Sequence, residues 1–403
     1  MPTPAEKWPD EFLVGMRQLG DPLADATVDA LFRRGDIANV NALLTTLVRN
    51  DLVPDGGTDP DIRAYLQATA SVPGIDHDLV AAAQDLFAKN GPLALFTLLC
   101  ASLPECYTMK KGVNVLWITQ RLQEHVLRRL LETAHMVTRV MTPGGLAPGG
   151  AGLRTASKVR LMHAAIRRLI LHGQHSKRTA DVGTLAEAMS ATAWDTSHLG
   201  VPINQMDLAY TLLTFSYVMP RSLDKLGMRL TDREREGFIH TWNVIGAVMG
   251  IRSDLLPASY AEAEWLFARI KELEGGASEA GQRMTAAVLR CMQDAIPGTV
   301  ADFLPLLLIT ELLDERTRQW LGITPPGPVS AAAQMFLMAN VRNSNWITRG
   351  ADKYVVVSPP IAKWVAGYVT VFLTNLGQPK GWQRQMFTIP DEVARHWELP
   401  KTR

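Results

Sequence analysis

The chain has 403 residues, of which 47% are hydrophobic, 20% charged and 7% aromatic, a profile typical of a soluble globular protein with a substantial core. Its 41 basic and 40 acidic residues nearly cancel, and no lysine- or arginine-rich run is long enough to follow a phosphate backbone, so nucleic acid is not an expected partner. The three cysteines show no paired metal-type spacing, which argues against a disulfide framework or a zinc–thiolate site.

Targeting signals are not apparent in the sequence. The first residues carry neither an apolar signal core nor a twin-arginine motif, so we expect a cytoplasmic protein. The most apolar runs, at 208–220, 303–310 and 355–376, are short or interrupted by polar residues and prolines, whereas a membrane-spanning helix needs ~20 apolar residues. These runs are therefore predicted to be buried helices, and we expect no integral membrane span.

Apolar residues recur three and four positions apart along the whole chain, and strand-like patterns are scarce, which predicts an all-α fold. In the N-terminal third, two amphipathic helices are expected over 21–34 and 40–50. A long helix is predicted from about 111 to 140. The glycine- and proline-rich segment 143–150 separates it from a helix over about 153–172. We expect one large helical domain over 1–403.

Capping residues mark helix boundaries in the middle of the chain. Asn204 is a suitable N-cap for a strongly apolar helix over 204–219. Thr231 and Glu234 have the spacing of a capping box and should open an amphipathic helix that Gly250 ends.

Among the nine histidines, His163 has the most suggestive surroundings. Residues on the same helical stripe are apolar, namely Val159, Ile166 and Ile170. Arg160 and Arg167 lie three residues before and four residues after it. A haem needs apolar walls, a neutral imidazole for its iron and arginine partners for its propionates, and this helix could supply all three. The same pattern also fits a core histidine hydrogen-bonded to a carboxylate, so spacing leaves both readings open.

A second polar group lies on the preceding predicted helix, where Arg129, Glu132 and Thr133 share one face. On a surface helix this would be an ordinary solvated face with one ion pair. If the helix packs over a haem, the same side chains could polarise bound oxygen or move a proton. Motifs for zinc proteases, covalent haem attachment, nucleotide binding and serine hydrolysis are missing.

Four segments together resemble the rubber oxygenase (latex-clearing protein) and MpaB-like oxygenase family. They are residues 101–107 (Ala-Ser-Leu-Pro-Glu-Cys-Tyr), 129–133 (Arg-Leu-Leu-Glu-Thr), 158–167 (Lys-Val-Arg-Leu-Met-His-Ala-Ala-Ile-Arg) and 200–208 (Gly-Val-Pro-Ile-Asn-Gln-Met-Asp-Leu). The resemblance runs over about 24–251, which we expect to be the catalytic core. The last third, 252–403, matches loosely and is expected to add helices that pack on that core.

The resemblance implies an all-α fold with a globin-like core that holds a non-covalent haem b through His163. It implies that Arg129 and Thr133 lie on the distal side, where the haem iron activates dioxygen to cleave carbon–carbon double bonds. The rubber oxygenases have a lysine three residues after the distal arginine, and this chain has Glu132 there. We therefore expect a five-coordinate or water-bound resting iron, or a proton-handling role for Glu132.

The expected function is that of a haem b-dependent oxygenase that uses O2. Because degradation of a solid polymer requires export, we expect a small apolar, unsaturated substrate of isoprenoid or lipid-like character. The competing hypothesis is a haem carrier or sensor, or an inactive helical scaffold. A peroxide-using haem enzyme is a third possibility.

Overall fold

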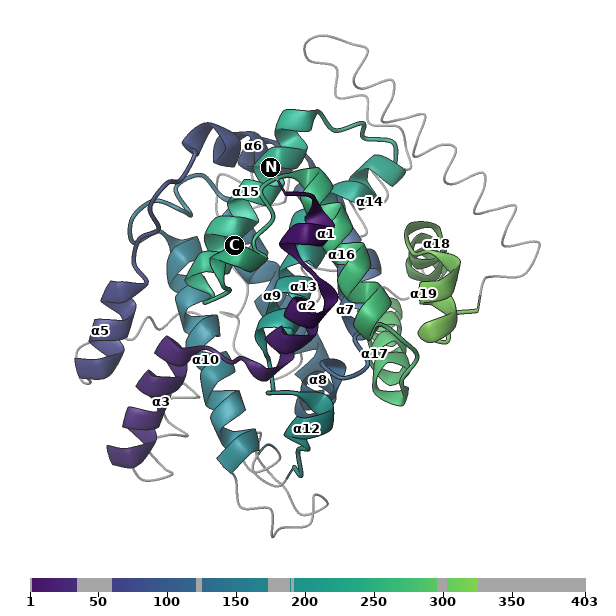
Figure 1. The fold of residues 1–403 in the computed structure, drawn as a ribbon. Helices are drawn as coiled ribbons and strands as arrows, with labels where there is room; N and C mark the ends of the chain where they lie inside the picture. The colour runs from purple at the N-terminus through teal and green to yellow at the C-terminus, as the bar shows by residue number, and fades with distance from the viewer. Residues whose placement is uncertain are drawn as a thin grey trace.

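The computed structural model describes residues 2–34, 60–120, 125–172, 189, 192–295 and 303–324. Every regular element in these ranges is helical, which confirms the all-α prediction, and one isolated bridge joins Met109 to Gly275 (Figure 1). The helix expected over 40–50 and most of the C-terminal segment lie outside the described residues.

The described elements in the first half are α1 (Pro4–Lys7), α2 (Asp10–Gly15), η1 (Met16–Gln18), α3 (Pro22–Arg34), α5 (Pro60–Ala68), α6 (His77–Thr97), η2 (Leu98–Ser102), α7 (Leu103–Tyr107), α8 (Val113–Gln120), α9 (His125–Met141) and α10 (Ala151–His172). Those in the second half are α12 (Thr196–Leu199), α13 (Gln205–Leu213), η4 (Thr214–Val218), α14 (Met219–Lys225), α15 (Asp232–Val248), η5 (Ser253–Leu255), α16 (Tyr260–Glu274), α17 (Glu279–Ala295), α18 (Phe303–Leu312) and α19 (Glu315–Trp320).

The predicted helix starts agree with the structure where the signal is a capping side chain. Thr231 and Glu234 form a reciprocal capping box at the start of α15, and Asn204 accepts a hydrogen bond from the backbone of Asp207 at the start of α13. The stretch predicted as one helix over 111–140 is described as α8 and α9, and residues 121–124 between them lie outside the description.

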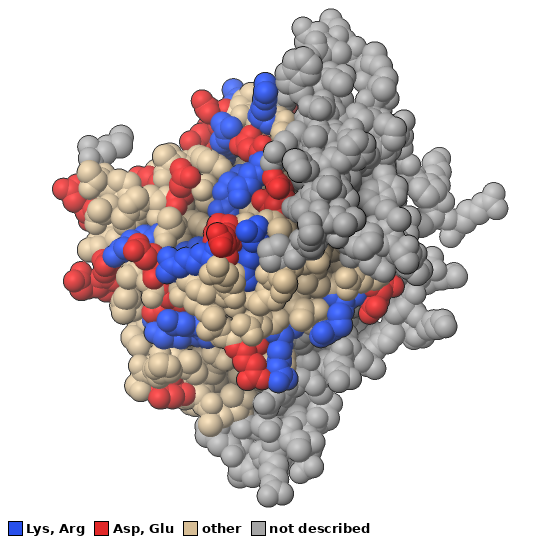
Figure 2. Space-filling view, turned by 90° about the vertical axis from the view of Figure 1, so that its right-hand side faces the viewer, with Lys and Arg blue, Asp and Glu red and all other residues tan. Residues whose placement is uncertain are grey.

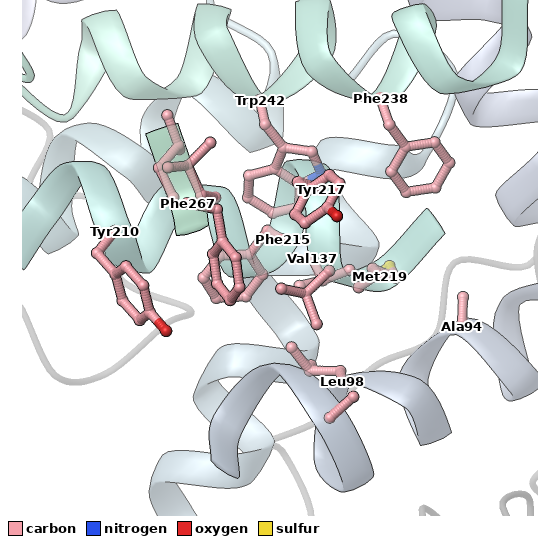
Figure 3. Close-up of a cluster of buried hydrophobic side chains, with 14 of the residues drawn as sticks. Ala94, Leu98, Val137, Tyr210, Phe215, Tyr217, Met219, Phe238, Trp242 and Phe267 are labelled. Atoms are coloured by element: carbon pink, nitrogen blue, oxygen red, sulfur yellow. The ribbon is translucent and has the colours of Figure 1, made fainter. Parts of the chain in front are cut away.

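The centre of the molecule is an aromatic layer between α15 and the helices around α6. Phe215 and Trp242 stack with their ring centroids 4.7 Å apart, and Tyr210 and Phe267 stack at 4.9 Å. Figure 3 shows these rings between α15, which carries Trp242, and the helix that carries Leu98. Such pairs add to the stability that burial of apolar surface already provides.

Two π-helical turns, η2 and η4, lie side by side in this core. Each immediately precedes a helix whose second residue is a proline, Pro104 in α7 and Pro220 in α14. A proline lacks an N–H and its ring clashes with the carbonyl four residues earlier, and a wider turn relieves both effects. The hydroxyl of Ser102 donates to the Thr214 carbonyl at 2.6 Å, so the two turns are joined directly.

A buried ion-pair network lies just beyond the same end of η2, in α7. The carboxylate of Glu105 is fully buried and contacts Arg221 Nη2 at 3.1 Å and Lys271 Nζ at 2.8 Å. The ammonium group of Lys271 also contacts the carboxylate of Asp314, at 2.8 Å. This network joins α7, α14, α16 and α19, which are far apart in the sequence.

Within the described residues, one helical stretch, His77–Tyr107, is long and apolar enough by length and composition to cross a membrane. However, 72% of its most apolar 18-residue window is buried inside the protein, as for a core helix. On the face seen in Figure 2, acidic and basic side chains of the described residues are interspersed, in keeping with the near-zero net charge.

Candidate functional site

His163 lies in the middle of α10, a 22-residue helix that packs against α3, α9 and α15. The apolar stripe predicted around it is present. Ile166 and Ile170 are buried against Val115 and Ile118 of α8 in a small separate cluster, and Val159 packs on the main core. Apolar packing of this helix on both sides therefore leaves His163 partly buried, with its Nδ1 inside the protein.

The imidazole of His163 is neutral and has an unused ring nitrogen. Its Nδ1 is buried and has no hydrogen-bond partner among the described residues. Burial is the main cause that lowers the pKa of His163 to about 4; the positive charges of Arg167 and Arg129 contribute in the same direction, and Asp21 opposes them. A core histidine bound to a carboxylate through Nδ1 would show a hydrogen bond at that nitrogen, whereas a metal ligand must be a neutral imidazole.

Arg129 is the predicted distal residue that the structure brings within electrostatic reach of His163. Its guanidinium contacts the Leu116 carbonyl at 3.4 Å. The hydroxyl of Thr133 donates to the Arg129 carbonyl at 2.8 Å, so its proton is already used and its oxygen can only accept a further bond. Glu132 is partly buried on the same helix, between them in sequence.

The predicted propionate partners Arg160 and Arg167 are engaged elsewhere. Arg160 binds Asp21 through two hydrogen bonds of 2.6 and 2.7 Å, and Arg167 pairs with Asp25. Every nitrogen of the two guanidinium groups has a protein acceptor. The arginines do flank His163, but their donors are directed at α3, α15 and the loop before α13, and the geometry gives no support to a propionate role.

Sequence reasoning did not single out four residues that lie near the arginines of α9 and α10. Asp21 and Asp25 bind its arginines, and no local pattern could have revealed this. Tyr107 and Cys106 lie within electrostatic reach of Arg129, and burial raises the pKa of Cys106 to about 11 and that of Tyr107 further above its usual value. The one available signal for this pair was the segment 101–107, which carries the family resemblance without a residue role.

The donor set limits the kind of metal centre. No group of three or more histidine, cysteine, aspartate or glutamate side chains that could hold a metal ion occurs within the described ranges. A buried neutral imidazole with a free nitrogen instead fits a centre that takes one protein ligand and brings its other ligands with it, as haem does.

The comparisons with known proteins agree with these observations. The family model described as ER-bound oxygenase mpaB/B'/Rubber oxygenase, catalytic domain, matches residues 93–343, which include His163 and the Arg129 helix. The matched range begins and ends later in the sequence than the catalytic core expected over 24–251. The expected bounds of that core therefore stay a prediction. Rubber oxygenase from Streptomyces sp. (strain K30) is 24% identical over 256 residues, which is 60% of this chain and 56% of that protein.

The chain thus spans little more than half of the length of that curated relative. A solved structure, "Structure of Latex Clearing Protein LCP in the closed state", has a TM-score of 0.68 at 20% identity and covers 93% of this chain and 95% of its own. At this identity the likeness shows a shared helical fold. Because the family model spans well over half of the sequence, the chain belongs to the MpaB and rubber oxygenase catalytic-domain family.

Proposed function

We propose that this protein is a haem b-dependent oxygenase that cleaves a carbon–carbon double bond in a small apolar substrate. The observation that carries the proposal is the neutral imidazole of His163, whose buried Nδ1 lacks a partner among the described residues, inside the matched family domain. The family name itself supports oxygenase chemistry.

In this proposal His163 is the proximal iron ligand. Its low pKa of about 4 keeps the ring neutral, and therefore able to bind iron, throughout the physiological pH range. Haem b, when bound, would supply an iron centre that activates dioxygen. In the overall reaction the double bond and the O–O bond break and two carbonyl groups form, so both oxygen atoms enter the products and no external reductant is consumed.

Three side chains of α9 would act on the reacting oxygen. Arg129 would place a fixed positive charge near the developing negative charge on oxygen, which low local dielectric makes effective. Glu132 would hold or deliver a proton at its carboxylate, in place of the lysine of the rubber oxygenases. Thr133, whose hydroxyl proton is already donated to the helix, would accept a hydrogen bond there.

The proposed substrate class rests on the name of the similar rubber oxygenase and on the small apolar substrate expected from the sequence. Rubber oxygenase is named for an apolar polymer, and a smaller isoprenoid or lipid-like molecule with a double bond has the same chemistry. The cytoplasmic location expected from the sequence stays a prediction.

An absorption spectrum of the purified protein tests the cofactor. We expect a Soret band with about one haem per chain, and loss of that band in His163→Ala. His198→Ala is the matched control, because His198 is exposed and should leave the band unchanged. Full haem occupancy in His163→Ala would overturn the ligand assignment.

A haem carrier or sensor is the competing function, and oxygen uptake separates the two. An oxygenase should consume O2 with unsaturated isoprenoids or fatty acids and form carbonyl products, and Arg129→Ala and Glu132→Gln should each slow this. A carrier would consume no O2 with any of these compounds.

A further inference from the structure

Two ion pairs join the N-terminal end of α3 to α10, one before and one after His163 in the sequence. Arg160, three residues before the histidine, binds both carboxylate oxygens of Asp21 at 2.6 and 2.7 Å. Arg167, four residues after it, pairs with Asp25. Because positions three before and four after lie on nearly the same helix face as the histidine, the two pairs fix the rotation of that face.

The same two arginines also bind backbone carbonyls of α15 and of the loop before α13. Arg160 also donates to the Val248 carbonyl at the end of α15, at 3.1 Å. Arg167 donates to the carbonyls of Pro202 and Ile203 at 2.9 and 2.8 Å. Ile203 has a φ of 53°, a strained value for a β-branched residue, and the hydrogen bond from Arg167 is one of the contacts that hold it.

Two glycines leave room for the ion pairs. A Cβ at Gly20 would lie 2.8 Å from a carboxylate oxygen of Asp25, and one at Gly250 would lie 2.5 Å from a carboxylate oxygen of Asp21. The side-chain amide of Gln205 donates to the carbonyls of both glycines at 2.9 Å. The backbone around the pairs is therefore tied together by a single buried side chain.

We infer that Asp21 and Asp25 are positioning residues for the haem ligand, acting through Arg160 and Arg167 to hold His163 at a fixed rotation and depth. This inference rests on the proposed function, since it assumes that His163 binds haem. It also gives the two arginines a role other than the one that their spacing suggested. The two pairs would act on the position of the imidazole through the helix that carries it, as the groups around a metal-bound side chain commonly do.

A third pair between the same helices supplies a matched control. Arg168 contacts Asp29 at 2.7 Å, one turn further along α3, but both side chains are considerably more exposed. Neither residue forms a hydrogen bond or ion pair with the α15 end or the loop before α13 in the described structure. Loss of this pair should change little at His163.

The experiment compares haem retention in Asp21→Asn, Asp25→Asn and the control Asp29→Asn. After loading with haem, its loss to an excess of a scavenging apoglobin is followed by absorbance. Asp21→Asn and Asp25→Asn should lose haem roughly tenfold faster or more, whereas Asp29→Asn should match the wild type. Equal rates in all four proteins would overturn the inference.

A second variant and a spectroscopic reading separate positioning from general loss of stability. Gly20→Ala leaves every charge in place but pushes a methyl group against the Asp25–Arg167 pair, and should also speed haem loss. In the ferrous state, the iron–histidine stretching band should shift or broaden in these variants and stay unchanged in Asp29→Asn. An unchanged band in all variants that remain folded would contradict the inference.

Failure of the two proposals is distinguishable. If the wild type shows no Soret band that depends on His163, the proposed function and the inference both fall. If the wild type binds haem through His163 and the aspartate variants behave like Asp29→Asn, only the inference fails.

Discussion

Acid should destabilise the apoprotein through His135, a histidine buried at 4% exposure where α9 packs on α10. Burial, followed by the positive charges of Arg139 and Lys158, lowers the pKa of His135 from 6.5 to about 4. The unfolded chain therefore binds a proton below about pH 6.5, and the native protein does so only near pH 4. Because the unfolded state binds more protons in that window, the free energy of unfolding falls as the pH falls.

The size of the effect follows from the shift. Each pKa unit corresponds to about 1.4 kcal/mol, so a change from 6.5 to about 4 gives about 3 kcal/mol by pH 4. The pKa of His163 is lowered by a similar amount, from 6.5 to about 4. Its contribution to the pH dependence of unfolding is the same in the wild type and in any variant that retains it. A comparison of the wild type with His135→Gln therefore isolates the contribution of His135.

The assay is urea unfolding of the apoprotein at pH 7 and pH 4.5, followed by circular dichroism. Between these values the wild type should lose about 2–3 kcal/mol more than His135→Gln. His198→Gln, which removes an exposed histidine, should behave like the wild type. An equal loss in the wild type and His135→Gln would refute the reasoning, because it would mean that His135 has the same proton affinity in both states.

Three other substitutions, one of them with a matched control, have defined outcomes. Glu105→Gln leaves two cations facing a neutral amide in the core and should cost about 3–5 kcal/mol in urea unfolding, whereas Asp232→Asn, at a carboxylate that is 98% exposed, should cost under about 0.5 kcal/mol. Gly250→Ala forces a side chain onto a φ of 79° and into a buried ion pair, and should destabilise the protein by about 1–3 kcal/mol in the same assay. Arg129→Gln removes a positive charge that lowers the pKa of His163, so this pKa should rise in an NMR titration of the apoprotein, and a fall would contradict the geometry.

Local signals in the sequence predicted local structure well. The capping box of Thr231 and Glu234 and the N-cap Asn204 were recognisable because their hydrogen bonds close within three residues. The apolar stripe of Ile166 and Ile170 was recognisable for a similar reason, since helical periodicity alone determines which face is buried.

The partners of the arginines could not be predicted in this way. Arg160 and Arg167 have the spacing expected of propionate ligands, but their acceptors Asp21 and Asp25 lie 139 and 142 residues away in the sequence. A helical pattern says which face a side chain occupies and nothing about which element packs there. The family resemblance indicated His163 and Arg129 as site residues, but it gave no role to any residue of α3.

The π-helical turns η2 and η4 have a consequence for how this sequence is compared with others. Each contains one residue more than an α-helical turn needs, so the helix faces before and after it are out of phase by about 100°. Deletion of one residue from Leu98–Ser102 would rotate α7, and with it Glu105 and Tyr107, by that angle relative to α6. A relative that lacks the extra residue would therefore differ by a gap of only one position in an alignment and yet present a different set of side chains to Arg129.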